Sequence, residues 1–403
     1  MGTPETIAVE NAHMPPFFAK TPISIAHGEG VWVWDEEGRR YLDLTAGWGV
    51  TSIGHAHPVI VRALAEQGAR IIQNPDSGLT YSPPRARLLE LLTGILPAGL
   101  TRVFFTNSGA EANDAAVKLA RKATGRTEVI ATEGSFHGRT ISMVSATGQA
   151  RHRDKFRPQM PGSIFVPYGQ AEAVKAELND QVAAVLVEPV QGEGGVRVPP
   201  PDYLRDLSRL CRANGTLLVV DEVQTGFCRT GPLFATAAAG ADADLLTMAK
   251  GIAGGFPLGA FAMTEAVADR LEAGDHGGTY CGNPLACAVA EAVIRHLVDE
   301  GVAARVEELG AQALARMGSW GGRFPGAVAG ARGMGLLLLV EFTSETTAAA
   351  VAAECLRRGA FVRQTQGTGL RVFPALTITP EELDEGLGIL EEAIAAVAAG
   401  EGA

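Results

Sequence analysis

The stretch Leu217-Leu218-Val219-Val220-Asp221-Glu222-Val223-Gln224-Thr225-Gly226 decides the fold. Its apolar run leads directly into two acidic residues and then into a loop that ends at a glycine. A run of this length, bounded by a turn signal, predicts a fully buried strand. A carboxylate at the end of such a strand is costly unless a cation or hydrogen-bond donors meet it, so Asp221 is a candidate functional residue. The alternative is a structural cap or a metal ligand.

Similar apolar runs lie on both sides of this strand, and amphipathic helical patterns separate them: Arg102 to Thr106, Glu128 to Ala131, Ile164 to Pro167, Ala183 to Glu188 and Leu245 to Met248. Strands that alternate with helices predict an α/β fold with a largely parallel sheet covered on both faces. Glycine-rich linkers follow several of these runs, at the strand ends where open α/β sheets bind ligands. We therefore expect the functional site at that edge of the sheet.

The two ends of the chain have different patterns. Residues 1–57 contain turn signals and β-like pieces such as Gly30 to Trp34, which predict an N-terminal arm and part of a small domain. We expect residues 58–299 to form the large domain and residues 300–403 to form a smaller α+β domain. In that last part we expect a final helix capped by Thr379, after helices and these strands: Gly335 to Phe342, Phe361 to Arg363 and Leu370 to Phe373.

Composition narrows the class of protein. The 403 residues are 46% hydrophobic and 20% charged, which is ordinary for a globular enzyme and unlike a disordered chain. A net charge of -11 without basic runs argues against a nucleic-acid partner, and the chain shows neither a membrane-spanning stretch nor a secretion signal. Five scattered cysteines without C-x-x-C spacing disfavour a disulfide framework or a zinc site. We expect a cytoplasmic protein.

Two further segments carry candidate chemistry. Ser108 and Gly109 fall at the start of a predicted helix, where unpaired N-H groups suit a phosphate, although Asn107 and Ser108 would cap a helix in any protein. Lys250 follows a buried strand and precedes Gly251, so its amine can project toward a ligand instead of lying on the surface as most lysines do.

The order of these segments is that of a known family. The chain resembles the class III (subgroup II) aminotransferases over nearly its whole length, and within them most closely the acetylornithine/succinylornithine aminotransferases. The resemblance is carried by Asn107-Ser108-Gly109-Ala110-Glu111-Ala112-Asn113, Phe136-His137-Gly138-Arg139-Thr140, Glu188-Pro189-Val190-Gln191-Gly192-Glu193-Gly194-Gly195, Asp221-Glu222-Val223-Gln224, Lys250-Gly251 and Thr279-Tyr280-Cys281-Gly282-Asn283-Pro284.

The resemblance implies a fold type I transferase dependent on pyridoxal 5'-phosphate (PLP), whose large domain has a mainly parallel seven-stranded sheet. Lys250 would carry PLP as a Schiff base and move a proton, and Asp221 would pair with the ring nitrogen. The family also implies a homodimer with shared active sites. The remaining cofactor-binding residues implied are Ser108, Gly109 and Ala110 at the phosphate, Phe136 and Val223 on the ring faces, Gln224 at the phenolic oxygen, His137 and Glu188 as supports, and Thr279 from the neighbouring subunit.

The substrate-binding residues implied are Arg139, Arg371, Glu193 and Trp48. Arginine suits bidentate carboxylate binding, and Glu193 would mask Arg371 until the keto acid arrives. The alternative is that either arginine makes only a structural ion pair. Trp48 departs from the family, since acetylornithine enzymes usually carry a smaller aliphatic residue there, and it leaves the donor open. His55 and His57 match a family turn without metal, so we expect no metal site.

The resemblance implies transfer of the ω-amino group of N-acetylornithine, or a similar acylated diamino acid, to 2-oxoglutarate. The products would be a semialdehyde and glutamate, formed in a ping-pong cycle. Another class III ω-aminotransferase, acting on ornithine, 4-aminobutyrate, putrescine or another amine, is the first alternative. A PLP aminomutase is the second, and a pair formed by Glu193 and Arg371 disfavours it because an aminomutase needs no exchangeable keto acid.

Overall fold

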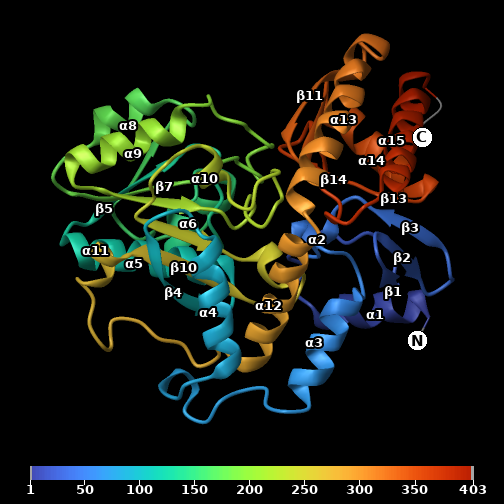
Figure 1. The fold of residues 1–403 in the computed structure, drawn as a ribbon. Helices are drawn as coiled ribbons and strands as arrows, with labels where there is room; N and C mark the ends of the chain where they lie inside the picture. The colour runs from blue at the N-terminus through green and yellow to red at the C-terminus, as the bar shows by residue number, and fades with distance from the viewer. Residues whose placement is uncertain (1, 401–403) are drawn as a thin grey trace.

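Seven strands form the central sheet of the structure, a computed structural model that describes residues 2–400 (Figure 1). In sheet order they are β4 (Leu100–Thr106), β10 (Gly259–Thr264), β9 (Leu245–Met248), β8 (Leu217–Asp221), β7 (Val182–Val187), β5 (Glu128–Thr132) and β6 (Ser163–Val166). Strand β10 runs antiparallel to both of its neighbours, while the pairs from β9 to β6 are parallel. The predicted α/β class and mainly parallel seven-stranded sheet are confirmed.

Helices cover both faces of this sheet. The helix α5 (Gly109–Thr124) packs on one face, where Leu119 lies in an apolar cluster with Leu186 of β7. The helices α8 (Ala171–Glu177) and α9 (Tyr203–Asn214) pack on the other face. Because both faces are buried, all six residues of β7 are apolar and buried, and the strand has no alternation of polar and apolar residues.

The remaining helices connect the sheets or flank them. Their bounds are α1 (Thr3–His13), α2 (Ala46–Gly49), α3 (Pro58–Gly68), α4 (Pro83–Ile95), α6 (Ile141–Ser145), α7 (Ala150–Arg153), α10 (Ala235–Ala238), α11 (Glu265–Ala268), α12 (Pro284–Asp299), α13 (Val302–Arg323), α14 (Glu345–Arg358) and α15 (Pro380–Ala398), with short 3-10 helices η1 (Ser77–Leu79) and η2 (Lys250–Ala253). Thr379 caps α15 in a capping box with Glu382, as the sequence predicts.

Two four-stranded sheets lie beside the large one. The first contains β1 (Ile25–Glu29), β2 (Trp32–Asp35), β3 (Arg40–Asp43) and β13 (Ala360–Phe361), and the second contains β11 (Val328–Met334), β12 (Leu337–Phe342), β15 (Gly369–Val372) and β14 (Arg363–Thr365). Because β13 pairs with β3, the two ends of the chain share a sheet, and both termini lie on the same side of the molecule in Figure 1. The domain boundaries at 57/58 and 299/300 stay a prediction.

Local differences from the sequence prediction have physical causes. The predicted strand Phe361 to Arg363 is two strands in different sheets, because the chain leaves β13 and enters β14 around Val362. The strand expected from Gly335 begins two residues later, since Gly335 adopts a positive φ of 55° in the turn after β11. Helix α1 has no buried residue, so no apolar stripe marked it in the sequence.

Candidate functional site

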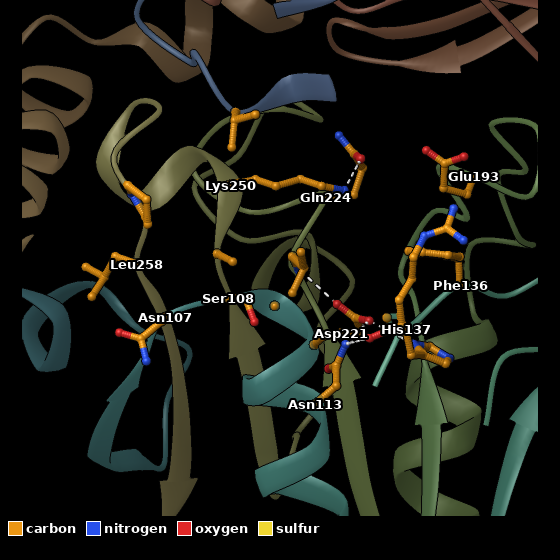
Figure 2. A pocket seen from close by; sticks show the side chains of 18 of the residues that line it. Asn107, Ser108, Asn113, Phe136, His137, Glu193, Asp221, Gln224, Lys250 and Leu258 are labelled. Carbon is orange, nitrogen blue, oxygen red and sulfur yellow. Dashed lines mark hydrogen bonds and ion pairs between the residues drawn. The ribbon is translucent and has the colours of Figure 1, made fainter. Parts of the chain in front are cut away.

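A cavity of about 440 Å³ lies at the carboxyl ends of the parallel strands (Figure 2). Each strand that ends there delivers a loop residue to it: Ser108 after β4, Phe136 after β5, Glu188 after β7, Val223 after β8 and Lys250 after β9. Twelve residues predicted for the site line this one cavity, namely Ser108, Gly109, Ala110, Phe136, His137, Arg139, Glu188, Glu193, Asp221, Val223, Gln224 and Lys250.

The start of α5 forms one wall of the cavity. Ser108 is the N-cap, and its hydroxyl accepts a hydrogen bond from the backbone N-H of Glu111 at 3.2 Å. The first backbone N-H groups of the helix, which lack partners within it, favour an anion. Gly109 is needed for close packing, because a Cβ there would lie 2.7 Å from Cγ1 of Val223.

A buried network holds Asp221 on the floor of the cavity. Oδ2 of Asp221 accepts hydrogen bonds from Nδ2 of Asn113 and from Nδ1 of His137, both at 2.7 Å (Figure 2). Oδ1 accepts from the backbone N-H of Val223 at 3.0 Å. The carboxylate at the end of β8 is therefore stabilised by donors, as its buried position requires. Nε2 of His137, also buried, has no hydrogen-bond partner among the described residues.

The side chains of Lys250 and Gln224 meet within the cavity (Figure 2). The Lys250 amine donates a hydrogen bond to Oε1 of Gln224, while Nε2 of Gln224 is buried and lacks a partner within residues 2–400. Burial lowers the pKa of the Lys250 amine from its ordinary value, although Glu193 and Asp221 oppose the shift. Lys250 adopts a positive φ of 41°, an uncommon conformation for a lysine and one that often marks a functional site.

Glu193, which lines the cavity, forms an ion pair with Arg371. Nη1 of Arg371 lies 2.8 Å from Oε1 of Glu193, but Nη1 and Nε have no hydrogen bond of good geometry to any described residue. Burial raises the pKa of Glu193, but Arg371 and Lys250 outweigh that effect and the net pKa lies below its usual value. Burial also lowers the pKa of Arg371 while Glu193 opposes the change. The buried guanidinium retains unused donors for a second carboxylate.

Glu188 joins two loops of the site. Its carboxylate accepts hydrogen bonds from the backbone N-H of Phe136 at 3.0 Å and of Gly192 at 3.3 Å. Burial raises the pKa of Glu188 to about 7, against the attraction of His137. This side chain therefore positions the Phe136 ring and the loop that carries Glu193.

Three predicted site residues lie outside the first cavity. Trp48 and Arg371 line an adjoining cavity of about 830 Å³, which shares Phe136, Arg139, Glu193 and Lys250 with the first cavity. Thr279 is exposed and lines a third cavity, where its carbonyl accepts a hydrogen bond from Nε2 of Gln73 at 2.6 Å.

Sequence reasoning missed Asn113, Val50 and the segment Phe256–Pro257–Leu258, which also line the first cavity. Asn113 was present in the family motif, and its spacing of four residues from Gly109 could have placed it one turn further along the same helix face. Nothing in the local sequence marks Val50 or the 256–258 segment, since their position depends on the packing of distant parts.

The two histidines of the Gly54-to-Pro58 turn have local partners. Nε2 of His55 lies 2.9 Å from Oδ2 of Asp43, and Nδ1 of His57 accepts a hydrogen bond from the backbone N-H of Val59 at 3.3 Å. No group of three or more potential metal ligands occurs within residues 2–400. None of the helices in that range combines the length and apolar character needed to cross a bilayer.

Comparisons with known proteins agree with this geometry. The family described as Aminotransferase class-III matches residues 15–394. An acetylornithine aminotransferase of Methanothermobacter thermautotrophicus is 43% identical over 98% of this chain and 99% of its own length. A [LysW]-aminoadipate semialdehyde transaminase of Deinococcus radiodurans is 37% identical over 96% and 90%. An ornithine aminotransferase structure from Toxoplasma gondii, described with partial occupancy of PLP at its active site, is 33% identical, has a TM-score of 0.93 and covers 99% of this chain and 95% of its own.

Proposed function

Because this chain belongs to the class III aminotransferases, we propose that it moves the ω-amino group of N-acetylornithine, or of a similar acylated diamino acid, to 2-oxoglutarate. The products are a semialdehyde and glutamate. The observation that carries this proposal is the buried ion pair between Glu193 and Arg371 beside Lys250. An enzyme that must accept a donor amine and then a dicarboxylic keto acid in one site needs a carboxylate-binding arginine that can be masked.

The residues of the first cavity fit PLP. The N-terminus of α5 suits its phosphate, with Ser108, Gly109 and Ala110 as the binding residues. The unpartnered Nε2 of Gln224 suits the phenolic oxygen, and the Asp221 carboxylate suits a protonated ring nitrogen. Phe136 and Val223 would cover the two ring faces, and His137, Glu188 and Thr279 complete the proposed set. When bound, PLP supplies an electron sink for the negative charge that develops on the substrate carbon.

The protein's own groups then bind, orient and move protons. The amine of Lys250 would hold the cofactor covalently. As a free amine it would take a proton from the substrate carbon, because its lowered pKa favours the neutral base. Arg139 binds the α-carboxylate of the donor, while Glu193 keeps Arg371 masked. When the acceptor binds, Arg371 turns to a carboxylate of 2-oxoglutarate.

The proposed active unit is a cytoplasmic homodimer in which Thr279 completes the site of the neighbouring subunit. Thr279 is exposed, and so are the nearby large side chains of Leu79, Tyr81 and Tyr280. This supports the proposal, because a group of exposed large apolar side chains commonly marks a surface that a partner covers. All five cysteines are free, which suits a reducing compartment. Sedimentation would test the dimer, and a Thr279→Ala chain should rescue a Lys250→Ala chain when the two are mixed.

Borohydride reduction of the PLP-loaded protein tests the covalent attachment. We expect the reduced adduct on the peptide that contains Lys250, and Lys250→Ala should abolish it. An adduct on another lysine would contradict the assignment. Rates measured with a panel of amino donors test the substrate. Stoichiometric formation of glutamate from 2-oxoglutarate with N-acetylornithine supports the proposal, whereas a preference for ornithine, 4-aminobutyrate or putrescine would show that the proposed donor is wrong.

A further inference from the structure

The adjoining cavity of about 830 Å³ forms the outer part of the active site, and we call it the mouth. It contacts the first cavity through Phe136, Arg139, Glu193 and Lys250. The residues that belong to the mouth alone come from the N-terminal part, from α7, from the start of α14 and from the sheet that contains β14 and β15. They include Trp48, Arg151, His152, Glu345, Arg363 and Arg371. Lys250, whose amine must meet the donor, therefore lines both cavities.

The mouth holds more positive charge than the proposed substrates use. Four of its lining residues are arginines, and Arg371 is the one that pairs with a carboxylate. Arg139, Arg151 and Arg363 make no ion pair within 4.0 Å with any described carboxylate, and Glu345 offsets part of their charge. His152 adds little, since burial and then Arg139 and Arg151 lower its pKa. This local excess of positive charge contrasts with the net charge of -11 of the whole chain.

N-acetylornithine carries one carboxylate, which Arg139 binds, and 2-oxoglutarate carries two, which Arg139 and Arg371 bind. Neither substrate therefore occupies Arg151 or Arg363. Both line the mouth, which shares Arg139 and Lys250 with the first cavity.

Arg363 and Arg151 are held in place by their neighbours. The Arg363 guanidinium stacks on the Trp48 ring, 4.8 Å from its centroid, which leaves its N-H edge free. The Trp48 backbone adopts a left-handed conformation with φ 69°, which is costly for a bulky residue and fixes the direction of the ring. Nη2 of Arg151 donates to Oε1 of Gln149 at 3.1 Å, and Gln366 donates to the same oxygen.

We propose that Arg151 and Arg363 bind a carboxylate on the acyl group of the donor. The preferred donors are then N-acylated diamino acids whose acyl group ends in a carboxylate, such as N-succinylornithine, and an acetyl group is a poorer fit. This inference rests on the proposed function, because only a reacting ω-amine places the acyl group at the mouth. Trp48 supports the guanidinium of Arg363 and packs against the acyl chain.

The test compares N-succinylornithine with N-acetylornithine, which share the reacting amine and differ by one carboxylate. With the PLP-loaded enzyme and saturating 2-oxoglutarate, we expect a kcat/KM for the succinyl donor about tenfold above that for the acetyl donor. Arg363→Gln and Arg151→Gln should each lower this ratio by about three- to tenfold, and the double variant should bring it near one. Arg209→Gln, on the exposed face of α9, removes the same charge elsewhere and should leave the ratio unchanged.

Two results would overturn the inference. The first is a ratio of one or less in the unmodified enzyme, and the second is a ratio that survives the double variant. If the KM for 2-oxoglutarate also rises in the double variant, both arginines belong to the acceptor instead. If neither acylated donor reacts while putrescine or ornithine does, the proposed function itself fails, and that outcome is distinct from reaction of both donors at equal rates.

Discussion

Asn113 offers a sharp test of how the site holds its central carboxylate. The side chain is buried on α5, and its Nδ2 donates to Oδ2 of Asp221 at 2.7 Å and to the carbonyl of His137 at 2.9 Å. Asn113→Asp keeps the shape but places an oxygen where that nitrogen lies. Two carboxylates at this separation repel each other, so the second ionises at a higher pH than an isolated carboxylate, and above that pH Asp221 loses its donor.

The expected magnitude follows from these contacts. A hydrogen bond to a charged group contributes about 1.5–3 kcal/mol, and its loss weakens the carboxylate that is proposed to bind the cofactor ring nitrogen. At about 1.4 kcal/mol per tenfold change, PLP affinity should fall roughly 10- to 100-fold at pH 8. The deficit should shrink toward pH 6, because a protonated Asp at position 113 can again donate to Asp221.

Absorbance titration of the apoprotein with PLP between pH 6 and 8 measures this effect. Asn113→Ala removes the same donor without adding a charge, so it should show a loss that varies less with pH. Asn214→Asp, at the end of α9, makes the same chemical change away from the cavity and serves as the control. A Kd for PLP within threefold of the unmodified protein at pH 8 in Asn113→Asp would refute the reasoning.

Three further predictions concern stability, each measured by thermal unfolding of the apoprotein. Burial raises the pKa of Glu188 from 4.5 to about 7, so the folded protein loses stability as pH rises from about 4.5 through 7. Glu188→Gln cannot ionise, so between pH 5 and 8 its free energy of unfolding should fall by about 3 kcal/mol less than that of the unmodified protein. Arg229→Lys should cost about 1.5–3 kcal/mol, because the buried guanidinium donates to the carbonyls of both Leu336 and Pro374. Thr379→Ala should cost about 1 kcal/mol by uncapping α15, whereas Thr379→Ser should cost little.

Local patterns in the sequence were sufficient to predict those strands and helix caps that depend only on neighbouring residues. The run Leu217–Asp221 has the bounds that its apolar residues predict, and Ser108 and Thr379 cap their helices with their own side chains. Strand β11 was missed because its two internal glycines and its arginine give no apolar alternation, and it is a strand through pairing with β12.

Long-range contacts explain what the sequence could not reveal. Arg229 looks like a surface residue of a polar loop, yet it is buried because the carbonyls that meet it come from residues 107 and 145 positions later in the chain. Asn113 looks like an ordinary helix residue until α5 is placed over β8 and β9, where Asp221 and Thr247 meet it. The family resemblance supplied the candidate residues, while the folded structure supplied their partners.

The site has two parts that come from different sheets, and this division bears on how its specificity can change. The residues proposed for PLP follow strands of the large sheet, whereas Trp48 follows β3, Arg363 lies in β14 and Arg371 lies in β15. Substitutions at Trp48 or Arg363 therefore leave the network around Asp221 intact. Donor choice can change without loss of the cofactor chemistry, since the acyl end of the donor and the PLP ring are held by separate elements. Trp48→Ile should then shift kcat/KM among donors while the Kd for PLP stays within about twofold, and a parallel loss of both would show that the two parts are coupled.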